Sequence, residues 1–372
     1  MCLTKPVSTI SLSRLAAEIC LCIADNLSQC DLNALCRTNR HFWALLNRYL
    51  YRYNARYHGA SALFWAAQYG QNSTAEYSLK EGADINSTDT SKRTPLLAAV
   101  ERWVRLYGFS YVFNYKGIAY PTKEGDDAMI RLFLEKGADI NAPNWTGLTP
   151  LHIASEAENG YLARLLLENG ADIHATDELG RTALHMAART GREAVISLLA
   201  EKGCDIDARD LDQKTPLHTA VGSGKDAVVR LLVELGADVN TANINRQTPL
   251  HTAAGNVMTC HTQLINIMRL LIEKGADIEA RCHCGSTPLH VAASGGCSEE
   301  TFQLLIDMGA DTTATDTFGF TVLQRGVRAR RRYVIDKLAR RSQRLAKKPR
   351  LQYIYDDEIE IVEADDDGGE YR

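Results

Sequence analysis

The tetrapeptide Thr-Pro-Leu-His occupies residues 149–152 and returns at residues 215–218, 248–251 and 287–290. Related tetrapeptides begin at Ser61, Thr94, Thr182 and Thr321. The first residues of these eight segments are separated by steps of 33, 55, 33, 33, 33, 39 and 34 residues. The recurrence of one 33-residue step indicates an internal repeat, and a period of this size is typical of solenoid proteins.

Each unit carries the start and stop signals of two short helices. Thr215 can cap a helix with its hydroxyl group, and Pro216 suits the first helical position, where a missing N–H is harmless. A second helix follows with an apolar stripe, and Gly236 stands where a left-handed C-cap is needed. One helix pair cannot bury its apolar face alone, so neighbouring units must stack into a solenoid. The corresponding glycines are Gly82, Gly137, Gly170, Gly203, Gly236, Gly275 and Gly309.

Signature and period resemble the ankyrin repeat, and the resemblance covers residues 59–340 in about eight units. It implies an all-α solenoid in which helix-turn-helix pairs are joined by β-hairpin turns. It also implies a non-enzymatic role in protein binding. A histidine recurs at one position of the unit, where ankyrin histidines form hydrogen bonds within the scaffold. These histidines are His152, His185, His218, His251 and His290.

Ankyrin arrays bind their targets through hairpin tips and the inner-helix face, so the resemblance also implies candidate target-binding residues. Trp145 is the first of these, because large aromatic side chains dominate the energetics of protein interfaces. The remaining candidates in the hairpins are Leu179, Arg181, Leu211, Lys214, Ile244 and Arg246.

The second unit contains an insertion of 22 residues between its two helices. Seven aromatic residues lie within residues 103–125, and the alternation from Phe109 to Tyr115 predicts a strand with one aromatic face. Two interpretations remain open. The insertion is either a patch that binds a target through Tyr111 and Phe113, or a flap that covers the groove or the neighbouring repeat.

Residues 8–57 do not follow the repeat, and their apolar residues outline short helices with caps at Ser28 and Asp31. The pattern resembles an F-box, in the form that precedes ankyrin arrays in many fungal proteins. This resemblance implies docking onto the Skp-type linker of a cullin-RING ubiquitin ligase. Ala16 stands where the family has a proline that shapes the linker-binding surface. The alternative is a helical cap that shields the first repeat. The implied linker-binding residues are Leu15, Ile19, Ile23, Leu27 and Leu32.

Charge is distributed unevenly along the chain. Residues 1–324 carry a net charge of -7, residues 325–350 carry +11, and residues 351–372 carry -8. An acidic main body does not suit nucleic acid, so we expect neither nucleic acid nor a membrane as a partner. The tail, residues 341–372, is basic and then acidic, and we expect it to be disordered. The cluster from Arg340 to Arg350 resembles a split nuclear-localisation signal, or forms a basic cap, so the predicted location is cytoplasmic, nuclear or both.

Most residues that could take part in catalysis or metal binding lie at positions fixed by the repeat. Cys282-His283-Cys284 lacks the two-to-four-residue spacing of a zinc site, which favours a pair of thiols on a hairpin tip. The ten cysteines show no regular spacing and predict reduced thiols. The sequence predicts no cofactor, metal or catalytic set. It favours a monomeric adaptor that recruits an unidentified target protein to a ligase, or else a scaffold or inhibitor without that linkage.

Overall fold

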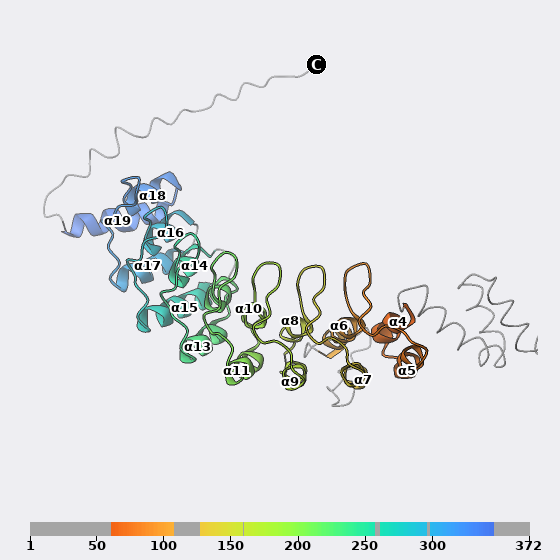
Figure 1. Ribbon diagram of the computed structural model, residues 1–372. Coiled ribbons are helices and arrows are strands. Elements are labelled where there is room, and N and C mark those ends of the chain that lie inside the picture. Colours follow the sequence, from red (N-terminus) through yellow and green to blue (C-terminus); the bar gives the residue numbers. More distant parts are fainter. Residues whose placement is uncertain (1–60, 108–126, 159, 257–260, 296–297, 346–372) are drawn as a thin grey trace, which may run out of the picture. The chain divides into compact units, whose positions relative to one another are not determined.

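The computed structural model describes residues 61–107, 127–158, 160–256, 261–295 and 298–345 (Figure 1). The chain divides into two units. Among the described residues, those from 61 to 219 together with 234–236 form the first unit, and those from 220 to 233 together with those from 237 to 345 form the second. The predicted F-box-like segment, the aromatic strand from Phe109 to Tyr115 and residues 346–372 of the predicted tail lie outside the described residues. Residues 341–345, which the sequence assigned to the tail, belong to the last described helix.

The described residues of the first unit form pairs of short helices, as the repeat predicts. In Figure 1, α4, α6, α8 and α10 lie in one row, and α5, α7, α9 and α11 lie in a second row. The helices of this unit are α4 (Ser61–Tyr69), α5 (Asn72–Lys80), α6 (Pro95–Tyr107), α7 (Ala128–Glu135), α8 (Pro150–Ala154), α9 (Tyr161–Glu168), α10 (Ala183–Thr190) and α11 (Glu193–Glu201).

Helix pairs continue along the rest of the described chain. Two helices contain residues of both units, α12 (Pro216–Gly222) and α13 (Asp226–Glu234). The second unit alone holds α14 (Pro249–Gly255), α15 (His261–Glu273), α16 (Pro288–Gly295), α17 (Glu299–Asp307), α18 (Val322–Arg328) and α19 (Arg332–Leu345).

The first helix of a repeat begins where the tetrapeptide predicts. Thr149 is the N-cap of α8 with extended backbone angles, and Pro150 occupies the first turn. The ring nitrogen Nδ1 of His152 accepts a hydrogen bond from the backbone N–H of Thr149 at 3.2 Å. The histidine therefore satisfies a donor that the helix itself leaves without a partner. The same arrangement joins Thr182 to His185 in the next repeat.

Left-handed glycines end the helices. Gly191 caps α10 with a φ of 84°, and its N–H donates to the carbonyl oxygen of Ala187. Gly236, predicted from the sequence as a left-handed C-cap, has a φ of 95°. Glycine adopts this conformation without the steric cost that a Cβ atom imposes.

The core of each unit is built from the leucine of the tetrapeptide and the apolar stripe of the second helix. In the first unit Leu151 and Leu184 are buried, and Leu162 and Leu166 of α9 are fully buried. In the second unit Leu250 and Leu289 are fully buried in the same way. Burying one such side chain stabilises the fold by roughly 1.5–3 kcal/mol, so the stacked leucines are the main apolar contribution of each repeat.

The hairpin segments differ from the predicted β-hairpin turns. Within the described residues they form no named strand, and the bridge between Thr315 and Thr321 is isolated. An Asp or Asn side chain organises the segment instead. One oxygen of Asp177, for example, accepts the backbone N–H groups of Leu179 and Arg181, each at 2.9 Å. This side chain takes acceptor positions that a paired strand would otherwise fill.

Backbone hydrogen bonds join each hairpin to the next within a unit. The N–H of Trp145 donates to the carbonyl oxygen of Ser91, and the N–H of Leu211 donates to that of Leu179. In the second unit the N–H of Thr317 donates to the carbonyl oxygen of Cys284. The hairpins of the first unit consequently stand side by side (Figure 1).

Trp103 lies in the C-terminal half of the second repeat's first helix. The sequence assigned it to the aromatic insertion, but the structure places it in α6, where its side chain is buried. Its ring stacks on Tyr161 with a centroid distance of 6.1 Å. The hydroxyl group of Tyr161 donates to the buried carboxylate of Asp127 at 2.6 Å, and Arg131 donates to the same oxygen. The described residues on either side of the insertion are therefore tied to the helical scaffold.

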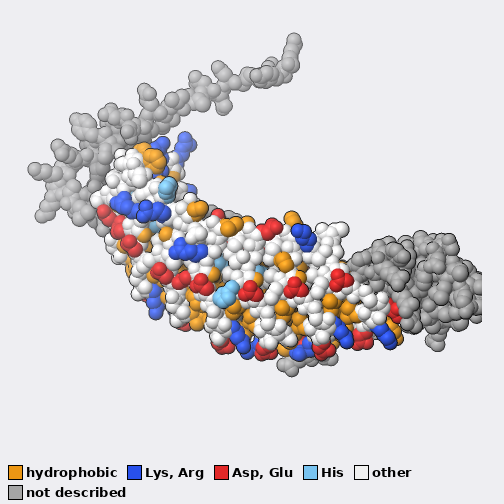
Figure 2. Space-filling view, viewed as in Figure 1, with side chains coloured by type: hydrophobic (Ala, Val, Ile, Leu, Met, Phe, Trp, Pro, Cys, Tyr) orange, Lys and Arg blue, Asp and Glu red, His pale blue; other side chains and the backbone are white. Residues whose placement is uncertain are grey.

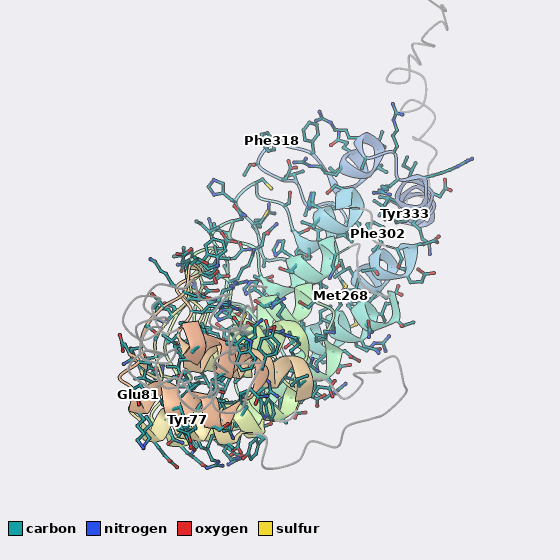
Figure 3. The ribbon with its side chains drawn as sticks, turned by 90° about the vertical axis from the view of Figure 1, so that its right-hand side faces the viewer. Tyr77, Glu81, Met268, Phe302, Phe318 and Tyr333 are labelled. Carbon is teal, nitrogen blue, oxygen red and sulfur yellow. The ribbon has the colours of Figure 1, made fainter. Side chains whose placement is uncertain are left out.

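The last two helices close the described part of the second unit. The ring of Phe302 in α17 meets Tyr333 in α19 edge to face, with a centroid distance of 5.9 Å (Figure 3). Val322 of α18 and Val334 of α19 are fully buried. Within the described residues, no helix is both long enough and apolar enough to cross a membrane.

Candidate functional site

Apolar side chains stand exposed at the ends of the hairpins. We define the hairpin tips as the two residues that lie four and three positions before the capping Thr of each repeat. In the first unit Trp145 is 61% exposed and Leu211 is 66% exposed, and Leu179 is also exposed. In the second unit Ile244 and Phe318 are exposed. Each unit thus presents apolar tips to solvent, as the sequence predicted for Trp145, Leu179, Leu211 and Ile244.

The backbone explains why the tip side chains face outward. The N–H groups of Trp145 and Leu211 are used by the preceding hairpin, and the N–H of Leu179 is used by the carboxylate of Asp177. Because these hydrogen bonds fix the backbone of the tips, the side chains point away from the scaffold. Exposed apolar groups that are held in place lose little conformational freedom on binding, which favours recognition of another protein.

The side chain of Arg181 is partly exposed, and it also has a partner within its own hairpin. Its guanidinium group lies 2.6 Å from the carboxylate of Asp177, a side chain that is almost fully buried. Burial raises the pKa of Asp177, but the hydrogen bonds from Arg181 and the backbone outweigh it, and the pKa lies below 3.8. The carbonyl oxygen of Arg181 also accepts a hydrogen bond from His152 at 2.9 Å. Arg181 therefore stabilises its own hairpin, whatever it contributes to binding.

Lys214 and Arg246, the other charged candidates, lie in different surroundings. The ammonium group of Lys214 pairs with Asp212 at 2.9 Å, and both side chains are largely exposed to solvent. Arg246 is exposed and has a left-handed φ of 57°, at the position where other hairpins carry Gly147 or Gly180. Both residues belong to the hairpin surface beside the tips.

Phe318 is a tip residue that the sequence reasoning missed. It is 68% exposed and projects from the described surface of the second unit (Figure 3). The guanidinium group of Arg325 lies 5.6 Å from the centre of its ring, a distance typical of a cation–π contact. The signal was available, because Phe318 precedes Thr321 by three positions, as Leu179 precedes Thr182. The tetrapeptide of the last repeat departs from the pattern, which concealed the equivalence of Phe318 to the other tip residues.

The two ends of the array carry further exposed groups. On α4, Trp65 and Tyr69 are half exposed, and their rings lie 5.2 Å apart. On α5, Tyr77 is also half exposed (Figure 3). Figure 2 shows some Lys and Arg side chains near α18, whose last turn contains Arg325 and Arg328.

The remaining predicted binding residues lie outside the part of the chain that the structure describes. Those assigned to the ligase linker, Leu15, Ile19, Ile23, Leu27 and Leu32, lie outside the described residues, as do Tyr111 and Phe113 of the insertion. Within the described ranges no group of three or more His, Cys, Asp or Glu side chains converges as a metal site would require.

The described histidines of the tetrapeptide are scaffold residues, as predicted. All five are buried. Burial lowers the pKa of His152, His185, His251 and His290 below 6.5, although nearby carbonyl oxygens raise it in part. A neutral imidazole is therefore the form that the fold stabilises at neutral pH.

Comparison with known proteins agrees with this geometry. The sequence matches the family described as ankyrin repeats (3 copies) over residues 118–210, 157–243, 207–282, 240–316 and 257–347. A match to the single ankyrin repeat covers residues 58–90. Among solved structures, the chain is similar to the ankyrin repeat domain of Bcl-3, described as a unique member of the IkappaB protein family. The two share 27% sequence identity with a TM-score of 0.52, over 67% of this chain and 99% of that one.

Proposed function

Because this chain belongs to the ankyrin-repeat family, we propose that it is an interaction adaptor whose hairpin surface selects a target protein for a ubiquitin ligase. Ankyrin repeats imply a role in protein–protein interaction, and proteins of this family are typically binding scaffolds without enzymatic activity. In the proposal, residues 8–57 hold the Skp-type linker of a cullin-RING ligase, of the SCF type. The chemistry of ubiquitin transfer belongs to other subunits.

The exposed hairpin tips carry the target-binding half of the proposal. Trp145, Leu179 and Leu211 in the first unit, with Ile244 and Phe318 in the second, expose more than half of their surface. A buried aromatic or aliphatic anchor at an interface is worth about 2 kcal/mol or more when truncated, roughly a thirtyfold change in affinity. Within each unit, such anchors on a fixed backbone can support binding of a specific partner.

The ligase half rests on the sequence pattern of residues 8–57. The regular apolar positions from Leu15 to Leu32 resemble those with which an F-box contacts its linker. Replacing Leu15 and Ile19 together by Asp would place two charges where the proposal requires apolar contact, and the desolvation cost would abolish docking.

The linker test uses the purified full chain and a Skp-type protein in a pull-down or calorimetric titration. We expect the wild type to bind and Leu15→Asp with Ile19→Asp to bind at least about a hundredfold more weakly. Trp145→Ala, on the array, serves as the matched control and should bind the linker like the wild type. Equal binding by the double variant, or no binding by the wild type, refutes the ligase connection.

The target test compares proximity labelling around the wild-type chain with labelling around Trp145→Ala combined with Leu211→Ala. Proteins that depend on the tips should disappear from the second set. Leu235→Ala, an exposed leucine that follows α13 away from the tips, is the control and should retain them. A target set that is unchanged by the tip substitutions contradicts the proposed binding surface.

A scaffold or inhibitory binding protein without a ligase is the second candidate. The likeness to the ankyrin repeat domain of Bcl-3, from the IkappaB protein family, favours it, because 99% of that solved domain is matched by this chain. This candidate predicts a target that depends on the hairpin tips together with no binding of a Skp-type protein. The two tests above therefore separate the two functions.

A further inference from the structure

One repeat breaks a rule that its neighbours follow. The residue five positions before the capping Thr has a side-chain oxygen in six of the hairpins, and in the hairpin before Thr287 it is Cys282. The six oxygen-bearing residues are Asp89, Asn144, Asp177, Asp210, Asn243 and Asp316.

The oxygen at this position has a defined task. In Asp316 it accepts the backbone N–H groups of Phe318 and Phe320, each at 2.9 Å. In Cys282 the sulfur replaces that oxygen, and it receives backbone hydrogen bonds from Cys284 and Ser286. The thiol of Cys282 thus occupies a pocket of N–H groups that elsewhere holds a carboxylate or an amide oxygen.

A second thiol lies against the first. The Sγ atoms of Cys282 and Cys284 are 3.2 Å apart, and the Sγ of Cys284 lies 3.3 Å from the hydroxyl oxygen of Ser286. The turn holds this geometry, because the N–H of Gly285 donates to the carbonyl oxygen of Cys282 and the N–H of Cys282 donates to that of Ser286. Cys282 is buried, whereas Cys284 is exposed to solvent.

The surroundings of Cys284 make its thiol more reactive than a buried thiol. The hydroxyl group of Ser286 has the largest effect and lowers the pKa of the Cys284 thiol. Burial raises the pKa in part, and the neighbouring thiol of Cys282 and backbone hydrogen bonds lower it further. Cys204, in another repeat, shows the opposite case, since burial raises its pKa to about 11. Thiolate is the reactive form of cysteine, so Cys284 is the more nucleophilic of these two exposed or partly exposed thiols.

We propose that Cys282 and Cys284 form an oxidisable dithiol that reacts with hydrogen peroxide and closes to a reversible disulfide. The Cys284 thiolate attacks one peroxide oxygen, the O–O bond breaks, and the leaving hydroxide takes a proton to become water. The sulfur of Cys282 then attacks the Cys284 sulfenic acid, a sulfur–sulfur bond forms, and the S–O bond breaks. The hydroxide that leaves takes the Cys282 proton as water. Two thiols lose two electrons, and one peroxide becomes two waters.

This modification goes beyond the proposed adaptor function, and it would change the hairpin surface that the proposal assigns to target binding. The carbonyl oxygen of Cys284 accepts both the N–H and the hydroxyl group of Thr317, the neighbour of the exposed tip residue Phe318. A disulfide withdraws the Cys282 sulfur from its two backbone donors, because the new bond redirects it toward Cys284. Oxidation therefore alters the contact between two adjacent hairpins.

The test exposes the full chain to hydrogen peroxide, in a Cys297→Ser background. Trypsin releases residues 282–325 as one peptide, in which Cys282 and Cys284 are then the only cysteines. After oxidation we expect this peptide to lose the mass of two hydrogens and to resist alkylation. A thiol reductant should restore both the original mass and the reactivity toward the alkylating reagent. Before oxidation, Cys284 should be alkylated at least about tenfold faster than Cys204. A peptide that retains two alkylatable thiols, or that gains oxygen irreversibly, overturns the proposal.

Matched variants separate chemistry from folding. Cys282→Asp restores the oxygen that other repeats carry, so it should fold normally while leaving Cys284 without a resolving thiol. Dimedone, a reagent for sulfenic acids, should label Cys284 in this variant after peroxide and should label the wild type at least about fivefold less. Equal dimedone labelling of both chains contradicts the resolving role of Cys282. Ser286→Ala should slow alkylation of Cys284, and an unchanged rate contradicts the assigned activation.

Discussion

The Nε2 atom of His185 lies 3.0 Å from the carbonyl oxygen of Lys214, which belongs to the hairpin of the following repeat. The Nδ1 atom of the same ring accepts the N–H of Thr182, so the ring proton resides on Nε2 and donates to Lys214. His152 and His251 make the corresponding bonds to Arg181 and Ser286. Each of these imidazoles caps its own helix and connects its repeat to the next.

Replacing this histidine should loosen the connection between repeats. We expect His185→Ala to lower the free energy of unfolding by about 1–3 kcal/mol, because the Thr182 N–H and the Lys214 carbonyl group both lose a buried partner. His185→Gln is the matched control, since Gln324 already accepts the N–H of Thr321 in the last repeat. Glutamine should recover part of the loss. Urea denaturation monitored by circular dichroism measures it, and equal losses in both variants would contradict the capping role.

Stability should fall as the pH falls below neutrality. Burial holds the pKa of four tetrapeptide histidines below 6.5 in the folded chain, whereas the unfolded chain keeps the ordinary value. Between these two values the unfolded chain binds more protons, so the histidines' contribution is complete above pH 6.5 and is lost as the pH drops through the folded pKa. Each group contributes a slope of up to about 1.4 kcal/mol per pH unit.

Urea midpoints measured at several pH values between 7.5 and 5 test this dependence. The variant His185→Gln removes one titrating imidazole and should show a shallower slope than the wild type. A stability that rises on acidification over the same interval is the result that would contradict the assignment.

The hairpin anchor Asp177 offers a second paired comparison. Asp177→Ala removes the acceptor of two backbone N–H groups and the partner of Arg181, and we expect a loss of about 2–4 kcal/mol in unfolding free energy. Asp177→Asn keeps an acceptor oxygen, as Asn144 and Asn243 do in their own hairpins. It should cost less than half as much in urea denaturation. A larger loss for Asn than for Ala would be inconsistent with this account.

Two left-handed glycines separate backbone strain from close packing between hairpins. Gly147 and Gly137 have φ values of 79° and 82°. A Cβ atom on Gly147 would lie 2.6 Å from the backbone nitrogen of Glu178, whereas one on Gly137 would meet nothing within 4 Å. We expect Gly137→Ala to cost about 1 kcal/mol and Gly147→Ala to cost at least about 2 kcal/mol more. Thermal or urea unfolding of the two variants measures the difference, and equal costs would show that the hairpins do not need this contact.

The sequence predicts the scaffold more completely than the surface. Thr149 and Pro150 fix a helix start through local chemistry, so the tetrapeptide alone locates it, and the recurring His152 position identifies a scaffold residue. The organising role of Asp177 was not predicted, because an isolated acid in a polar segment does not reveal that its oxygen replaces the hydrogen bonds of a strand pair. Trp103 was assigned to the insertion by composition, but only tertiary contact with Tyr161 shows that it is buried.

The tips form a middle case. Repeat register places Trp145 and Leu211 at the hairpin tips, and the structure shows both side chains exposed there, while their role in target binding stays a prediction. Phe318 was not predicted, because the tetrapeptide of its repeat departs from the pattern. Its spacing of three residues before Thr321 is nevertheless the spacing of Leu179 before Thr182. The residues of the predicted linker surface remain a prediction.

Neighbouring hairpins are joined through main-chain atoms, as between Trp145 and Ser91 or between Leu211 and Leu179. Peptide groups are common to all amino acids except proline, which lacks the N–H, so this attachment places almost no demand on which side chain stands there. Mutation can therefore exchange Trp, Leu, Ile or Phe along the row while the helices behind it remain intact. A lineage that carries this array can acquire a new partner one substitution at a time, without passing through an unfolded ancestor.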